Sequence, residues 1–248
     1  MVELLSGGNS NQVYRQGDTV IRQCGPSSPF VHALLRFLAE KGFSQAPRLI
    51  ATDGTTETLT FIEGDVGNDP LKPDMLTDAV LIEAAQLLRR FHDVTQQFVL
   101  PQDFQFLLPK QPDQPHEVIC HNDFAPYNCV YQDGHIVGII DFDTATPGSR
   151  IWDVAYAVYR FVPLMTDQHC IDQGWSVPPD RAQRLRLFCD HYGRIDRTLL
   201  VDTILRRIQA LVSFMRENQF NEHHIPIYLE DMAYIRSNRE ALEAGLFS

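Results

Sequence analysis

The 248-residue sequence predicts an α+β fold in which a small antiparallel sheet with one helix precedes a mainly helical part. Short strand-like runs alternate with turn signals up to Ile62, which favours a sheet. From Arg150 onward apolar residues recur at helical spacing. We therefore expect an N-terminal lobe at 1–64, which ends in a hinge, and a C-terminal lobe at 65–248.

The N-terminal elements begin with a predicted hairpin, since strand-like runs at 13–15 and 19–22 flank a Gly-Asp turn. After two prolines, aliphatic residues at 31–38 keep helical spacing, and a glycine follows as a plausible stop. Two more strand-like runs, at 48–52 and 57–62, surround an Asp-Gly turn. We expect five strands with one inserted helix.

The C-terminal elements are predicted to be mostly helices. An amphipathic helix at 75–94 is followed by a loop at 101–115 that is rich in Pro, Gln and Asp. Further helices are expected at 151–164, 180–194, 198–218 and 222–246. Pro226 should disturb the start of the last helix.

The bulk composition excludes several classes of protein. A formal net charge of -11 argues against nucleic-acid binding, which needs a basic surface. No apolar run approaches the length of a membrane span, and the N-terminus lacks the pattern of a signal peptide, so we expect a cytoplasmic protein. Five cysteines without C-x-x-C spacing argue against a disulfide framework or a zinc ribbon. The oligomeric state is not readable.

The segment from His121 to Asp141 carries the chemistry. It opens with the pattern H-x-D-x-x-x-x-N, in which Asp123 follows a short apolar strand and Asn128 comes five residues later. A carboxylate can accept the proton of an attacking hydroxyl, while an amide oxygen and a second carboxylate suit Mg²⁺. The pattern therefore favours magnesium-dependent phosphoryl transfer.

A predicted hairpin brings the two ends of this segment together. The chain runs out at 129–131, turns at an Asp-Gly pair and returns at 135–140. Pairing of the two strands returns Asp141 to the neighbourhood of Asn128. A strict two-residue turn would set Asn128 opposite Ile139, so we expect a bulge or a loose end near the site, and the exact register is not readable.

Each residue also has an ordinary structural interpretation. Asp123 and Asn128 could cap a turn, Asp141 could end a strand, and His121 could be a buried core histidine. Their order, spacing and strand context together favour the catalytic interpretation.

The segment resembles the catalytic loop of the aminoglycoside phosphotransferase family, whose members share the two-lobed protein-kinase-like fold. Residues 140–143 resemble the family's metal-binding strand end, and 88–92 resemble its helix ahead of the catalytic loop. Residues 152–155 are similar to its D-[LV]-A helix start, and 59–64 to its hinge strand. The resemblance runs from about residue 5 to about residue 165.

The resemblance implies a role for each matching residue. Asp123 would be the general base, and Asn128 and Asp141 would hold Mg²⁺. Asp143 either adds a carboxylate near a second metal or is structural, and we favour the structural role. Asp153 would brace the catalytic loop.

The resemblance also implies an ATP site made from a glycine-containing loop, a cation on the following strand, and the hinge backbone. The expected residues are Gly7, Gly8, Asn9, Ser10, Arg22, Phe61, Ile62 and Glu63. Arg22 departs from the family's lysine, and the next helix shows no clear glutamate partner for it. A plain turn at the glycines, and an ordinary exposed Arg22, are the structural alternatives.

The sequence thus predicts an ATP-dependent kinase that phosphorylates a hydroxyl of a small, amine-bearing molecule, either aminoglycoside-like or a metabolite. Acidic residues of the C-terminal lobe could attract the amine. They are Asp167, Asp172, Glu217, Glu222, Glu230 and Asp231, although solvated helix faces explain most of them equally well. The alternative is a non-catalytic binding or immunity protein with the same fold that holds a nucleotide, antibiotic or peptide.

Overall fold

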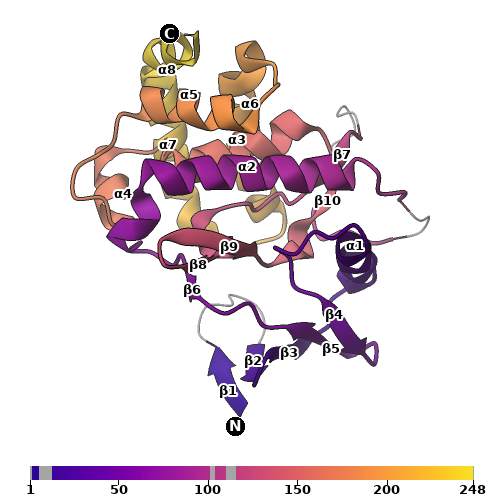
Figure 1. Ribbon diagram of the computed structural model, residues 1–248. Coiled ribbons are helices and arrows are strands. Elements are labelled where there is room, and N and C mark those ends of the chain that lie inside the picture. The colour runs from indigo at the N-terminus through magenta and orange to yellow at the C-terminus, as the bar shows by residue number, and fades with distance from the viewer. Residues whose placement is uncertain (1, 6–12, 101–103, 110–115, 248) are drawn as a thin grey trace.

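The computed structural model describes residues 2–5, 13–100, 104–109 and 116–247. A five-stranded antiparallel sheet with helix α1 (Ser28–Glu40) against it forms one part, and helices dominate the rest, as Figure 1 shows. The predicted α+β class is therefore confirmed. The division after residue 64 stays a prediction.

The N-terminal sheet has the strand order β1-β2-β3-β5-β4. Its strands are β1 (Val2–Leu5), β2 (Val13–Gln16), β3 (Thr19–Gln23), β4 (Leu49–Thr52) and β5 (Thr56–Thr60). Both predicted hairpins are present, and glycine occupies the positive-φ position in each turn: Gly17 has φ 59° and Gly54 has φ 86°. In the register of β3 with β5, Arg22 lies directly opposite Glu57.

A small layer of strands lies between this sheet and helix α2 (Asp78–Thr95) (Figure 1). One group has the order β6-β8-β9 and the other pairs β7 with β10. The strands are β6 (Asp65–Val66), β7 (Val118–Cys120), β8 (Cys129–Gln132), β9 (His135–Ile139) and β10 (Thr146–Gly148). Single 3-10 turns precede β8, at Pro126–Asn128, and β10, at Phe142–Thr144.

The remaining helices pack on α2 and on one another, and together they bury a continuous apolar core. They are α3 (Arg150–Phe161), α4 (Asp167–Asp172), α5 (Arg181–Tyr192), α6 (Leu200–Glu217), α7 (Ile225–Ser237) and α8 (Arg239–Phe247). Three more 3-10 turns span Pro73–Leu76, Arg197–Leu199 and Glu222–His224. None of the helices among the described residues is both long and apolar enough to span a membrane.

Two helix predictions were wrong. The single helix expected at 222–246 is two helices, because the Asn238 side chain donates to the Tyr234 carbonyl at 2.9 Å and ends α7 there. The prediction that Pro226 disturbs the start of this helix is confirmed. A 3-10 turn at Glu222–His224 precedes α7, and Pro226 lies in its first turn, where its missing N–H costs nothing. Helix α4 was not predicted, since six residues are too few for a clear helical period.

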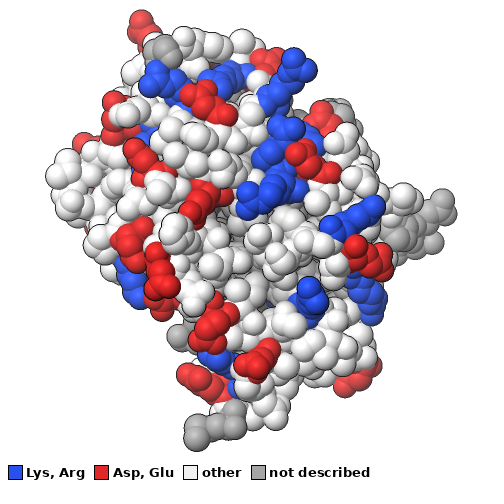
Figure 2. Space-filling view, in the orientation of Figure 1, with Lys and Arg blue, Asp and Glu red and all other residues white. Residues whose placement is uncertain are grey.

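The negative charge of the chain is unevenly distributed. On the face in Figure 2, Asp and Glu side chains lie mostly along the left and lower margins, whereas Lys and Arg gather in the upper half toward the right. The net charge of -11 therefore does not describe every surface of the molecule.

Candidate functional site

Strand β7 delivers the chain into the loop that carries the H-x-D-x-x-x-x-N pattern. The fully buried carboxylate of Asp153 accepts hydrogen bonds from the backbone N–H groups of His121 and Asn122, both at 2.7 Å. Asn122 has φ 64°, a conformation that this double contact can hold in place. The prediction that Asp153 braces the loop is confirmed by these contacts.

His92 completes the support for Asp153. Burial lowers the pKa of His92, so its ring is neutral; Nε2–H donates to Asp153 at 2.9 Å, and Nδ1 accepts from the Tyr192 hydroxyl at 2.7 Å. Burial alone would raise the pKa of Asp153, but the hydrogen bonds from His92 and from the backbone N–H of His121 bring it below the usual value. The brace is therefore a charged carboxylate with donors on both oxygens.

Asp123 points its carboxylate toward two donors. The Tyr127 hydroxyl donates to Oδ1 at 2.6 Å, and the Asn128 amide nitrogen donates to Oδ2 at 2.8 Å. Burial raises the pKa of Tyr127 well above its usual value, and the charge of Asp123 adds to this, so the hydroxyl keeps its proton. The two contacts fix the orientation of the carboxylate.

The β8–β9 hairpin contains the expected bulge. Gln132 pairs with His135, but the register shifts by one residue so that Cys129 pairs with Ile139. The backbone N–H of Ile140 then donates to the Asn128 carbonyl at 2.9 Å. Asp141 follows directly, so the prediction that the hairpin returns it to the neighbourhood of Asn128 is confirmed.

Asp141 has a left-handed backbone conformation with φ 62°, and 52% of its side chain is accessible. Partial desolvation raises its pKa, and the negative charge of Asp143 raises it further, while the positive charge of Arg22 opposes both. Three like charges gather here, since Asp123 also contributes to the shift. Such a cluster favours binding of a cation.

The donor set suits Mg²⁺. The nitrogen of the Asn128 amide is committed to Asp123, so the amide oxygen is left to face a cation. With the Asp141 carboxylate it offers two oxygen ligands, which are enough for an ion that keeps several waters.

Arg22 links the N-terminal sheet to this site. Its guanidinium donates to both oxygens of Asp143, at 2.7 and 3.0 Å, and lies 3.9 Å from the nearer oxygen of Asp141. Burial alone would lower the pKa of Arg22, but the charges of Asp143 and Glu57 raise it above its usual range. Arg22 therefore stays charged, and the interpretation of it as an exposed surface arginine is wrong.

The acidic partner of Arg22 is Glu57 of β5, which the sequence reasoning missed. One Glu57 oxygen accepts from Arg22 Nε, and the other meets the ring of His32 on α1. The Glu57 side chain is fully buried. A usable signal existed in the sequence, because Glu57 shares the strand face of Leu59, which is buried.

Cys24 lies beside this pair, and its sulfur, a His32 nitrogen and a Glu57 oxygen lie within 4.8 Å of one another. Three such ligands can hold a metal ion. However, both Glu57 oxygens already have partners in Arg22 and His32. We interpret the group as internally paired.

The predicted hinge residues lie between β5 and β6. Phe61 donates its backbone N–H to the Asp18 carbonyl at 2.8 Å, and the Arg15 guanidinium stacks 3.7 Å from the centre of the Phe61 ring. Arg15 also pairs with the exposed Glu63 at 2.7 Å. Ile62 packs so tightly on Gly138 that a Cβ there would lie 2.7 Å from it, which ties the hinge to the catalytic hairpin. The expected loop residues Gly7, Gly8, Asn9 and Ser10 lie outside the described residues.

The acidic residues expected to attract an amine are partly committed to other partners. Asp167 pairs with Arg181 at 2.7 Å. Asp231 is buried and accepts from the Tyr159 hydroxyl at 2.6 Å, and it contacts His169 at 2.7 Å. Glu230 also lies 3.4 Å from His169.

Comparison with known proteins agrees with this geometry. The chain is 32% identical over 208 residues to the trifolitoxin immunity protein of Rhizobium leguminosarum bv. trifolii, a match that covers 81% of this chain and 78% of that protein.

Two solved structures show the same fold. An amicoumacin kinase in complex with AMP-PNP, Ca²⁺ and Ami has a TM-score of 0.64 at 12% identity, over 98% of this chain and 88% of its own. A spectinomycin phosphotransferase in complex with ADP and spectinomycin has a TM-score of 0.56 at 15% identity, over 99% of this chain and 92% of its own.

The model of the phosphotransferase enzyme family matches residues 2–105 and 96–195. These ranges include the sheet, the catalytic loop and the hairpin described above. The predicted resemblance is confirmed, and the chain belongs to the phosphotransferase enzyme family, with the kinase-like fold of the aminoglycoside phosphotransferases.

Proposed function

We propose that this phosphotransferase moves the γ-phosphoryl group of ATP to a hydroxyl of a small molecule. The observation that carries the proposal is the hairpin that returns the chain to Asn128 just before Asp141, while the Asn128 amide holds Asp123. The Asp123 carboxylate is 2.8 Å from the Asn128 amide, and the hairpin sets Asp141 two residues beyond the Ile139 that pairs beside them. Relatives solved with AMP-PNP or ADP support a nucleotide as donor.

Asp123 would act as the base. As the acceptor oxygen attacks the γ-phosphorus, the hydroxyl proton passes to an Asp123 oxygen, the new O–P bond forms, and the bond from phosphorus to the leaving ADP oxygen breaks. Tyr127 and Asn128 hold the carboxylate in one orientation while this happens. A bound Mg²⁺ would supply positive charge to the phosphate oxygens, and Asn128 and Asp141 would hold it.

Arg22 and the hinge would position the nucleotide. Arg22 keeps a full positive charge beside Asp141 and Asp143, which is where the phosphates would approach. The backbone at Phe61–Glu63 would face the adenine, and the loop with Gly7, Gly8, Asn9 and Ser10 would cover the phosphates, as the family resemblance implies. The acceptor would bind beside the catalytic loop, on the helical side.

The experiment is a thermal melt with Mg²⁺ and ATP, followed by ADP release with a panel of hydroxyl-bearing metabolites and antibiotics. Ligand binding raises apparent stability, so the melting temperature should rise with Mg²⁺ and ATP together. Asp141→Ala should remove most of this shift. Asp133→Asn, a charge loss at the exposed turn of the same hairpin, is the matched control and should keep it.

Asp123→Asn tests the chemistry separately. It should keep the nucleotide shift but lower turnover by about 10²–10⁴-fold, the usual range for loss of a general base. Equal turnover in both proteins would remove Asp123 from the mechanism. If neither ATP nor GTP shifts the melting temperature with any divalent metal, the protein does not use a nucleotide.

A second candidate function is binding without turnover, which the 32% identity to an immunity protein favours. That name is compatible with either protection by phosphorylation or protection by capture. Protection by phosphorylation would require Asp123, whereas protection by capture would not. If Asp123→Asn protects cells from a toxic small molecule or peptide as well as the wild-type protein does, the protein acts by binding.

A further inference from the structure

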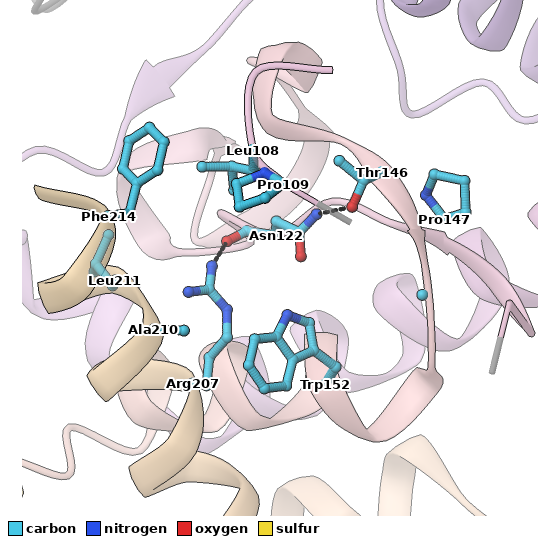
Figure 3. A pocket seen from close by; sticks show the side chains of 11 residues that line it. Leu108, Pro109, Asn122, Thr146, Pro147, Trp152, Arg207, Ala210, Leu211 and Phe214 are labelled. Atoms are coloured by element: carbon cyan, nitrogen blue, oxygen red, sulfur yellow. Dashed lines mark hydrogen bonds between the residues drawn. The ribbon is translucent and has the colours of Figure 1, made fainter. Parts of the chain in front are cut away.

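A pocket opens beside the catalytic loop, between the start of α3 and the face of α6 (Figure 3). It holds about 500 Å³ of space, part of it in the open mouth. Its walls are mainly apolar and include Leu108, Pro109, Trp152, Leu211 and Phe214. Asn122, the residue before Asp123, also lines it, so the pocket adjoins the candidate base.

Arg207 of α6 is the charged group of this pocket. It is only 5% exposed, and its Nη2 donates to the Asn122 carbonyl at 2.5 Å. Its Nε–H is buried and finds no hydrogen-bond partner among the described residues. Nor does any described carboxylate form an ion pair with it.

Two aromatic rings partly compensate this charge. The guanidinium lies 4.7 Å from the centre of the Tyr156 ring and 5.5 Å from that of Trp152. Contacts between a cation and a ring contribute about 0.5–2 kcal/mol, which is less than the cost of burying an ion without a partner. Buried charges in proteins are usually paired, so Arg207 lacks an anionic partner that a ligand could provide.

We propose that this pocket binds the carboxylate-bearing aromatic end of the acceptor. The carboxylate would pair with the Arg207 guanidinium, and the ring would lie among the apolar walls against Trp152. This proposal rests on the proposed function, because only a kinase would make the bound molecule a phosphoryl acceptor. An amine elsewhere on the same molecule would lie outside this pocket.

The pocket is connected to the candidate base by direct contacts. Arg207 packs on Tyr156, whose hydroxyl is 2.8 Å from that of Tyr127, and Tyr127 donates to Asp123 at 2.6 Å. These contacts link the pocket to Asp123 through packed side chains, and the backbone links them directly, since Asn122 lines the pocket and precedes Asp123. Proximity of acceptor and base is what phosphoryl transfer requires.

The test uses benzoate as probe and benzylamine as its counterpart of similar shape and opposite charge. Binding is followed by the indole N–H signal of Trp152 in the ¹⁵N-labelled full-length protein. Benzoate should shift this signal, and benzylamine should not. Arg207→Gln should weaken benzoate binding by at least fivefold.

Two further variants separate the site from general effects. Arg206→Gln removes the neighbouring charge on the exposed side of α6 and should leave benzoate binding unchanged. Ala210→Leu keeps Arg207 but places extra carbons in the pocket, and it should also weaken benzoate at least fivefold. This variant keeps the test valid if Arg207→Gln does not fold.

The proposal is overturned if benzoate leaves Trp152 unmoved, if benzylamine binds equally well, or if the folded Arg207→Gln or Ala210→Leu protein binds benzoate normally. The Mg²⁺–ATP melting shift is recorded for every variant. Benzoate binding without any nucleotide shift would overturn the proposed kinase function but keep the pocket. A melting shift with Mg²⁺ and ATP but no benzoate binding would keep the proposed kinase function and overturn the pocket.

Discussion

Two fully buried carboxylates, Asp153 and Glu57, hold the two sides of the site in different ways. Asp153 takes all its hydrogen bonds from within the helical part, namely from the catalytic loop and His92. Glu57 holds Arg22, whose other nitrogens reach out of the sheet to Asp143. The first carboxylate holds the loop that carries Asp123, and the second holds Arg22, which links the N-terminal sheet to Asp143.

The largest expected effect concerns Asp153. Asp153→Ala should lower the free energy of unfolding by about 3 kcal/mol, because it leaves His92 and two buried N–H groups without an acceptor. Urea denaturation measures this. Asp190→Ala, which breaks an exposed pair with Arg197, should cost about 1 kcal/mol or less. Equal losses in both variants would show that Asp153 is not the anchor of the loop.

The contribution of Asp153 to stability should also depend on pH. The pKa of Asp153 lies below its usual value in the folded protein, so its contribution is present above the unfolded-state pKa and is lost as pH falls through the folded one. The difference in stability between wild type and Asp153→Ala should therefore narrow in strong acid.

The next effect concerns Glu57. Glu57→Gln keeps the shape but removes the charge that faces Arg22, so Arg22 should lose its position and ATP should bind about 3–10-fold more weakly, a change of about 1 kcal/mol. The KM for ATP should rise while turnover at saturation changes less. Asp190→Asn, which removes a charge from the exposed pair with Arg197 outside the candidate site, is the control. If both variants raise KM equally, the buried position of Glu57 has no special role.

The smallest effect concerns Asp141. Its raised pKa means that the folded protein loses stability as pH rises from the usual value of 3.8 to the higher folded-state value. Asp141→Asn should therefore raise the melting temperature of the nucleotide-free protein slightly at neutral pH, and asparagine tolerates the left-handed conformation there. The same variant should lose the Mg²⁺–ATP shift. A lower melting temperature without nucleotide would contradict the assigned direction.

The catalytic segment could be predicted because its parts are close in sequence. Asp123, Asn128 and Asp141 are joined by one hairpin, and the Asp-Gly turn fixes which residues face each other to within one position. Counting pairs from that turn was enough to predict a bulge or a loose end near the site, although it did not give the exact register. Local chemistry and local geometry agreed, which is why this part of the prediction held.

The partners of Arg22 and Asn122 could not be predicted because the contacts span long stretches of chain. Glu57 is 35 residues from Arg22, with a helix and a strand between them, so the strand register is invisible in the sequence. Arg207 is 85 residues from Asn122, and its position depends on how α6 packs. A weak signal exists in α6, since Arg207 shares its buried face with Ile204 and Ile208.

The place of Glu57 in the sheet has a consequence for control of the enzyme. In protein kinases the acid that pairs with the phosphate-binding cation sits on a helix, and displacement of that helix switches the enzyme off. Here both members of the pair occupy facing positions of adjacent strands, and α1 contributes only His32. An outward swing of α1 would take His32 away from Glu57, but the pairing of β3 with β5 would still hold Arg22 opposite Glu57.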